Sequence, residues 1–243
     1  MQIHDLIPLG VSQDEFLNWP DFLAYCSRNT PESIEKFPRD VLPEVNGLAR
    51  NRFLNLTGIL HFSKSPQFHF PDCVVNCTSY SSNSPSENQI LNQQECGGTL
   101  VNQLESALAF LAQNLGNVPT PDLSLTNSIN LEISKNTLQE ALVNALLHRD
   151  YSITASIHVS VFTDRVEIVS PGITPNRLSM DKIKLGITFK RNQILCSIAT
   201  RILPYSGLGS GIRRILAEHP ATEFISDEKL GDQFTVILKR PKI

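Results

Sequence analysis

Three polar side chains recur at every fourth position of the segment EALVNALLHRDY, residues 140–151. They are Glu140, Asn144 and His148. A carboxylate can act as a general base toward water, an amide oxygen can bind a divalent cation, and an imidazole can exchange a proton near neutral pH. Residues four apart in an α-helix lie on one face, so the three side chains would form a single stripe. The other positions are mostly apolar, which predicts a helix covered by protein on most sides.

Two structural explanations compete with a functional one for this stripe. Residues 137–140 read Thr-Leu-Gln-Glu, the pattern of a capping box in which Glu140 would bind the backbone amide of Thr137. The stripe could also be a solvated edge, although an edge more often carries Lys or a second Glu than Asn. The helix alone leaves the three explanations open.

Two glycine-bearing segments further along the chain favour a ligand site. The run GLGSG contains Gly207, Gly209 and Gly211 and directly precedes an expected helix, where freed backbone amides would face an anion. The segment VSPGITP, residues 169–175, follows an expected strand and supplies Gly172, where a ligand could approach the backbone closely. Each segment alone is also explained as an ordinary turn.

The order of elements after residue 125 indicates how these pieces are positioned. The sequence predicts, in order, a strand (125–134), a helix (137–149), two strands (154–163 and 166–170), two helices (192–203 and 212–219) and two final strands (222–226 and 233–240). Tight turns between neighbouring strands imply a mixed sheet with helices on one face. The expected fold class is α+β, a two-layer α/β sandwich with a smaller N-terminal α+β appendage.

We expect three units along the chain: a helical lead (1–45), a small β-ribbon with a helix (46–116) and, after a proline-bearing linker (117–124), a main domain (125–243). In the second unit, the runs 54–63 and 73–81 are rich in β-formers and could pair as a ribbon. Residues 81–98 are polar and turn-rich, which predicts a surface loop before a helix over 99–116.

The composition limits the classes of function. The chain has 243 residues, 41% of them apolar, with a formal net charge of −3, so no global positive field favours nucleic acid or an anionic membrane. No leader peptide or membrane-spanning run is recognised, and the odd, scattered set of five cysteines favours reduced thiols. We therefore expect a cytoplasmic protein without a membrane partner.

Taken in order, EALVNALLHRDY, VSPG and RNQILCSIATRILPYSGLGSGIRRI resemble the motifs of the GHKL (Bergerat-fold) ATPases. The closer resemblance is to the C-terminal ATPase-like domain of RecG-like, Schlafen/AlbA-type transcriptional regulators. It covers roughly residues 125–243. Upstream, LNLTGILHFSKSPQFHFPDCVVNC is similar to a segment of the same group, so the unit 46–116 is interpreted as the C-terminal remnant of an AlbA-type region.

The resemblance implies ATP and Mg²⁺ as ligands, with slow ATP hydrolysis used as a switch in a regulator. Glu140 would polarise the attacking water, and Asn144 would hold Mg²⁺ against the phosphates. Glycine amides at Gly207, Gly209 and Gly211 would cradle those phosphates.

At the adenine end, Ser170 and Gly172 take the place of the first glycine box. GHKL ATPases usually bind the adenine amino group with an Asp where this chain has Ser170, and a neutral hydroxyl accepts a weaker hydrogen bond. Weaker adenine binding is therefore expected. The alternative is a degenerate fold with an empty pocket that serves as a protein-interaction or dimerisation module.

Nucleotide is the expected partner, and a homodimer or another protein are further candidates. Direct DNA binding is disfavoured because the AlbA-type half that normally precedes such a domain is not found in the sequence. A helicase is not expected either, since no Gly-x4-Gly-Lys-Ser/Thr loop is present.

Overall fold

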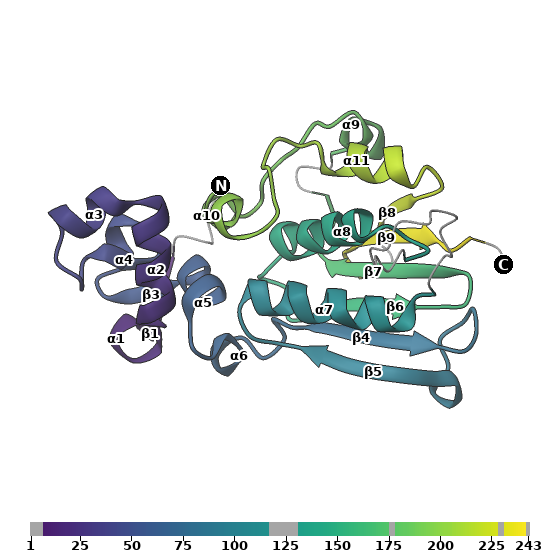
Figure 1. Cartoon of the computed structure of the whole chain (residues 1–243), viewed down its shortest axis with the longest axis horizontal. Helices are drawn as coiled ribbons and strands as arrows, with labels where there is room; N and C mark the ends of the chain where they lie inside the picture. The colour runs from purple at the N-terminus through teal and green to yellow at the C-terminus, as the bar shows by residue number, and fades with distance from the viewer. Residues whose placement is uncertain (1–6, 117–130, 175–177, 228–230, 242–243) are drawn as a thin grey trace, which may run out of the picture.

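A computed structural model describes residues 7–116, 131–174, 178–227 and 231–241 (Figure 1). Within these ranges the strands form two sheets, one of three strands in the order β1-β3-β2 and one of six in the order β5-β4-β6-β7-β9-β8. Helices lie across one face of the larger sheet, as α7 and α8 show in Figure 1. The predicted α+β class and the two-layer α/β sandwich are confirmed.

The larger sheet is mixed. Its strands are β4 (Val75–Tyr80), β5 (Ile90–Cys96), β6 (Ile157–Val161), β7 (Arg165–Pro171), β8 (Glu223–Asp227) and β9 (Gln233–Lys239). Strands β4 and β6 are parallel, with Val75 opposite Ile157, and the other neighbours are antiparallel. Burial alternates along β4 and β6, as expected when one face packs on the core.

The helices of this part are α7 (Leu100–Asn114), α8 (Lys135–His148), α9 (Met180–Lys184), α10 (Gln193–Ile202) and α11 (Gly211–Glu218). Helix α7 packs on β4 and β5, α8 packs on β7, and α11 packs on α8. Phe110, Leu142 and Val159 are fully buried in the shared core. Helix α8 is thus enclosed between the sheet and its neighbouring helices.

The N-terminal part has its own small sheet and core. Its elements are β1 (Pro8–Ser12), α1 (Gln13–Phe16), α2 (Trp19–Asn29), α3 (Pro31–Lys36), α4 (Leu42–Val45), β2 (Ala49–Arg50), β3 (Phe53–Asn55), α5 (Leu56–Phe62) and α6 (Pro66–His69). Phe22, Leu48 and Ile59 are fully buried in this second core, which Ile198 of α10 also joins. Helix α10 therefore connects the two parts.

The strand predicted at 54–63 is wrong. The chain leaves β3 at Asn55, whose Oδ1 accepts a hydrogen bond from Gly58 N at 3.0 Å and caps α5. Every residue of α5 is buried, Thr57 and His61 included, so this short run has no exposed polar face by which helix and strand can be told apart. The ribbon predicted from 54–63 and 73–81 is therefore absent from the described residues. Strand β4 pairs instead with β5, which lies inside the predicted surface loop 81–98.

The predicted unit 46–116 is also divided differently in the structure. Strands β4 and β5 belong to the same sheet as β6, and α7 shares a core with α8. The small sheet takes the residues before them. Strand β4 has β6 as its second neighbour, and Leu56 and Leu60 of α5 also join the larger core, so α5 contributes to both cores. The linker and most of the strand predicted at 125–134 lie outside the described residues.

In the part of the chain that the structure describes, no helix is both long and apolar enough to span a bilayer. Each of the five cysteines is a buried free thiol.

Candidate functional site

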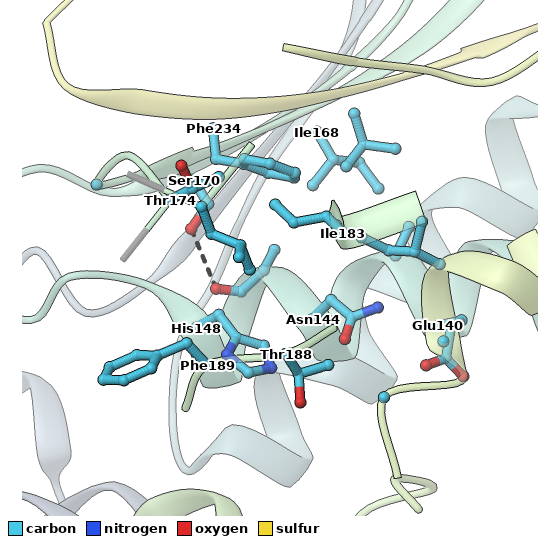
Figure 2. Close-up of a pocket in the computed structure, with 18 of the residues that line it drawn as sticks. Glu140, Asn144, His148, Ile168, Ser170, Thr174, Ile183, Thr188, Phe189 and Phe234 are labelled. Atoms are coloured by element: carbon cyan, nitrogen blue, oxygen red, sulfur yellow. Dashed lines mark hydrogen bonds between the residues drawn. The ribbon is translucent and has the colours of Figure 1, made fainter. Parts of the chain in front are cut away.

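A pocket lies between α8 and the strands β7 and β9 (Figure 2). Helix α9 and residues from 187–189 and 205–212 line its other sides. The space not filled by atoms is about 950 Å³, counting the solvent at the mouth. Small-molecule sites are concave and mostly apolar, with a few convergent polar groups, and this pocket has that kind of lining.

Helix α8 presents Glu140, Asn144 and His148 to this pocket. Between them lie Ala141 and Ala145, whose small side chains leave space above the helix. From Leu138 to Leu147 the rest of the helix is mostly apolar and buried, so its polar stripe is the side that faces the pocket (Figure 2). The solvated-edge explanation does not hold for Glu140, because this residue is only 7% exposed.

The capping-box explanation for Glu140 is wrong. The N-cap of α8 is Ser134, whose Oγ accepts a hydrogen bond from Thr137 N at 3.1 Å. The helix begins at Lys135, which puts Glu140 in its second turn, beyond the free amides of the first turn. The carboxylate therefore has a different partner.

That partner is Arg214 of α11. Its Nη2 donates to Glu140 Oε2 at 2.6 Å, and its Nη1 donates to Ser210 Oγ at 2.6 Å. Gly211 lies against the same carboxylate, and a Cβ atom added there would be 2.9 Å from Glu140 Cδ. A side chain at this position would displace the end of Glu140 or Asn144, so glycine lets α11 begin against both groups.

Asn144 has an unsatisfied donor. Its Nδ2 is buried and has no hydrogen-bond partner among the described residues. A Cβ atom added at Gly211 would lie 3.0 Å from this nitrogen, so Asn144 and Glu140 meet the same end of the glycine loop. A buried amide without a partner costs about 1–3 kcal/mol, and a ligand in the pocket would remove that cost.

The glycine loop, residues 207–211, contacts Gly186, which follows α9. Gly207 and Gly209 have φ of +69° and +72°, a conformation that favours glycine. A Cβ atom at Gly209 would lie 2.7 Å from Gly186 O, so the two backbones touch. Gly209 and Gly211 line the pocket. Gly207 does not line it, and its nearest side chains are those of Lys190 and Thr200.

The other end of the pocket contains Ser170 and Gly172 at the close of β7. Ser170 is 5% exposed, and its Oγ donates to Ala145 O of α8 at 3.1 Å. Gly172 has φ of +101°, and a Cβ atom there would lie 2.6 Å from Cβ of Asp150. Glycine thus allows β7 to end against the residues that follow α8.

His148 lies in the pocket one turn after Asn144. Burial, together with the charges of Lys190 and Arg191, lowers its pKa to about 4. Its Nε2 is 3.5 Å from the hydroxyl of Tyr205, whose own pKa is raised, mainly by burial. Near neutral pH His148 is therefore an uncharged imidazole.

The residues after α8 fix the end of the helix. Arg149 donates to the carbonyls of Asp72 and Ala155, and Asp150 forms an ion pair with Arg191. Asn192 donates to the carbonyls of Leu147 and Arg149 at 3.0 and 2.9 Å, which satisfies the last turn of α8. These contacts position the helix. Arg149, Asp150 and Asn192 do not line the pocket, which the polar stripe of α8 faces.

The structure brings together six of the seven predicted site residues, with Gly207 outside the pocket. The predicted set did not include Arg214, which pairs with Glu140, or the apolar lining, which includes Ile168, Ile173, Ile183, Ile187, Phe234 and Val236. Alternation along β7 puts Ile168 on the face of Ser170, a signal that could have identified it. The position of Arg214 depends on how α11 packs on α8, which no local pattern in the sequence encodes.

Comparison with known proteins supports an ATPase-like region. Residues 154–238 match the family described as "Putative ATP-dependent DNA helicase recG C-terminal". This range begins after α8, so it contains Ser170, Gly172 and the glycine loop but neither Glu140 nor Asn144. No curated protein matches the chain.

Among solved structures, the chain is similar to the DIP2311 protein from Corynebacterium diphtheriae, with a TM-score of 0.71 and 18% sequence identity. The similarity covers 98% of this chain and 40% of that one, so this chain spans less than half of the other protein. At this identity the likeness concerns the fold. The family match, taken by itself, supports an ATPase-like domain related to RecG in residues 154–238.

Proposed function

We propose that this pocket, which α8, the start of α11 and the strands β7 and β9 line, binds ATP together with Mg²⁺. The observation that carries the proposal is the meeting of Glu140 and Asn144 with Gly211 at one end of the pocket. This end offers a carboxylate, a carboxamide and a glycine backbone at the first turn of α11. Backbone amides at a helix start favour anions, and ATP carries its negative charge on the phosphates.

The donor set fits Mg²⁺ held jointly with a ligand. Asn144 supplies one amide oxygen, and no group of three or more His, Cys, Asp or Glu side chains in the described ranges is arranged around a metal. Mg²⁺ commonly takes one or two protein ligands and completes its shell with water and phosphate oxygens. When bound, the ion would neutralise phosphate charge. Asn144 is the residue that would hold it.

The opposite end of the pocket, formed by Ser170 and Phe234, suits a base. We call it the apolar end. Ile168, Phe234 and Val236 provide apolar surface, and Ser170 is a polar group beside them. Because Ser170 donates its proton to Ala145 O, its oxygen remains as an acceptor for an amino group. Adenine presents such an amino group.

We further propose that any hydrolysis is slow and depends on Glu140, which would orient and polarise water. The family resemblance supports a regulatory role, in which ATP binding changes the state of a transcriptional regulator. The motif content of the chain supports an ATP-responsive domain rather than a DNA motor.

The first test is a calorimetric titration with ATP, ADP and GTP, each with and without Mg²⁺. Asn144→Ala should reduce Mg²⁺-dependent ATP affinity by about ten-fold or more, because the metal loses its protein ligand beside the phosphates. Without Mg²⁺ the loss should be smaller, because only the hydrogen bond that Asn144 Nδ2 could donate to the ligand is then removed.

Gln139→Ala is the matched control, since Gln139 is half-buried on the same helix and does not line the pocket. It should bind ATP as the parent chain does. Loss of binding in both variants would mean that α8 has been disturbed. Unchanged Mg²⁺ dependence in Asn144→Ala would contradict the proposed metal ligand.

The alternative function, an interaction module with an empty pocket, has one observation in its favour. Glu140 and Ser170 both have partners within the protein, Arg214 and Ala145. Absence of any heat of binding or thermal shift at millimolar ATP and Mg²⁺ would select this alternative.

A further inference from the structure

Glu140, Asn144 and Gly211 form what we call the polar end of the pocket. The ion pair between Arg214 and Glu140 joins the two helices that line this end. Arg214 extends from the first turns of α11, next to Gly211, and reaches Glu140 Oε2 at 2.6 Å. The carboxylate side chain is 9% exposed, whereas the arginine side chain is 47% exposed. A buried anion is thus neutralised by a cation that retains access to solvent.

Arg214 is also anchored to the glycine loop. Its Nη1 donates to Ser210 Oγ at 2.6 Å while Nη2 holds Glu140. The guanidinium therefore spans the loop and α8 at the point where the proposed phosphates would lie. The neighbouring Arg213 is placed differently, since its Nε lies 2.9 Å from a Cβ atom added at Gly186.

A phosphate group would compete with Glu140 for this guanidinium. Arginine forms parallel hydrogen bonds with phosphate as readily as with carboxylate, and a terminal phosphate carries more charge than one carboxylate. As long as Arg214 holds Glu140, one carboxylate oxygen is occupied and is not free to act on water. Transfer of Arg214 to a phosphate would release that oxygen.

We propose that Arg214 is a positioning residue that exchanges Glu140 for the terminal phosphate of a bound nucleoside triphosphate. This inference rests on the proposed function. It makes the pocket selective for a triphosphate over a diphosphate, because a diphosphate lacks the group that draws Arg214 away. Glu140 is paired before the ligand arrives and is freed when the triphosphate binds.

The test is a double-mutant cycle read by calorimetry with ATP·Mg²⁺ and ADP·Mg²⁺. Arg214→Gln should lower ATP affinity by about ten-fold and leave ADP affinity nearly unchanged, because a hydrogen bond to a charged group is lost with ATP alone. Glu140→Gln should raise ATP affinity several-fold, since Arg214 no longer has a competing partner. In the double variant this gain should disappear.

Arg213→Gln is the matched control, because it removes the same charge from the same helix without touching Glu140. It should keep the parental ratio of ATP to ADP affinity. Arg214→Lys retains the charge but lacks the planar guanidinium, so it should give an intermediate ratio of ATP to ADP affinity. This variant replaces Arg214→Gln in the test if Arg214→Gln does not fold.

The outcomes separate this inference from the proposed function. If the parent chain and Glu140→Gln bind neither nucleotide, the proposed function fails and the exchange fails with it. If the parent chain binds ATP but Arg214→Gln keeps the ATP-to-ADP ratio, or loses both ligands alike, the exchange alone is overturned.

Discussion

The two ends of the pocket differ in how their polar groups are satisfied. At the end formed by Glu140, Asn144 and Gly211, the Asn144 amide nitrogen has no partner within the described residues, and the carboxylate is paired with a half-exposed arginine. At the end formed by Ser170 and Phe234, the hydroxyl donates to a helix carbonyl among apolar side chains. The first of these is the polar end and the second is the apolar end.

The difference indicates which end should respond to a ligand. Groups that have stable internal partners gain little from a new contact, whereas a buried group without one gains the full value of its first hydrogen bond. Binding energy should therefore come mainly from the polar end, through charge, and selectivity for the base should be weak. The following predictions test this difference between the two ends.

The largest effect is expected at Gly211. A Cβ atom there would meet the carboxylate and amide of Glu140 and Asn144, so Gly211→Ala should abolish ATP binding. Forcing a methyl group into a filled space costs about 1–3 kcal/mol, which unfolding in urea would measure. Gly97→Ala is the control, because its added Cβ would have Gln67 as nearest neighbour at 3.5 Å, an ordinary contact. Normal ATP binding by Gly211→Ala would show that the polar end does not hold the phosphates.

The polar end was largely predictable from the sequence, because helical periodicity alone put Glu140, Asn144 and His148 on one stripe. The glycines signalled the close approach of a loop. Their partner Arg214 was not predictable, since its contact depends on the packing of α11 against α8 across 74 residues of chain. Local patterns encode which face a residue takes, and tertiary packing decides what it meets there.

The N-terminal half was predicted less well for a related reason. Strand β5 has polar residues at most positions, because it is an edge strand exposed over six of its seven residues, and so it lacked an apolar signal. Helix α5 has the opposite problem, since its uniform burial removed the periodicity that distinguishes a helix. Both errors contributed to the expectation of a two-stranded ribbon from 54–63 and 73–81.

A second, intermediate effect concerns pH and His148, which lies beside the polar end. Its folded pKa of about 4 is below its ordinary value of 6.5, so the unfolded chain binds the proton more readily. The stability due to the neutral imidazole is therefore complete above pH 6.5 and is lost as the pH falls toward 4. We expect the parent chain to lose about 1–3 kcal/mol more than His148→Gln between pH 7 and pH 4.5.

Urea unfolding of both chains at the two pH values checks this prediction. The comparison must be made as a difference, because burial also lowers the pKa of His61 to about 4 and adds a loss of the same sign. His61 is unchanged in both chains, so its contribution cancels. Equal losses in the parent and the variant would mean that His148 is not held neutral by its surroundings.

The smallest effect is expected at the apolar end. Ser170→Ala removes one hydrogen bond to Ala145 O, but that carbonyl keeps a second donor, Arg149 N, at 3.2 Å. No buried carbonyl is left unpaired, so the loss of stability should be about 0.5–1.5 kcal/mol. If the Ser170 oxygen accepts from the adenine amino group, the ratio of ATP to GTP affinity should also fall, by about ten-fold or less. Ser160→Ala on β6, outside the pocket, is the control for both measurements. A Ser170→Ala chain that keeps the parental ATP-to-GTP ratio would leave Ser170 with a purely structural role, and the base would then be bound by apolar contact alone.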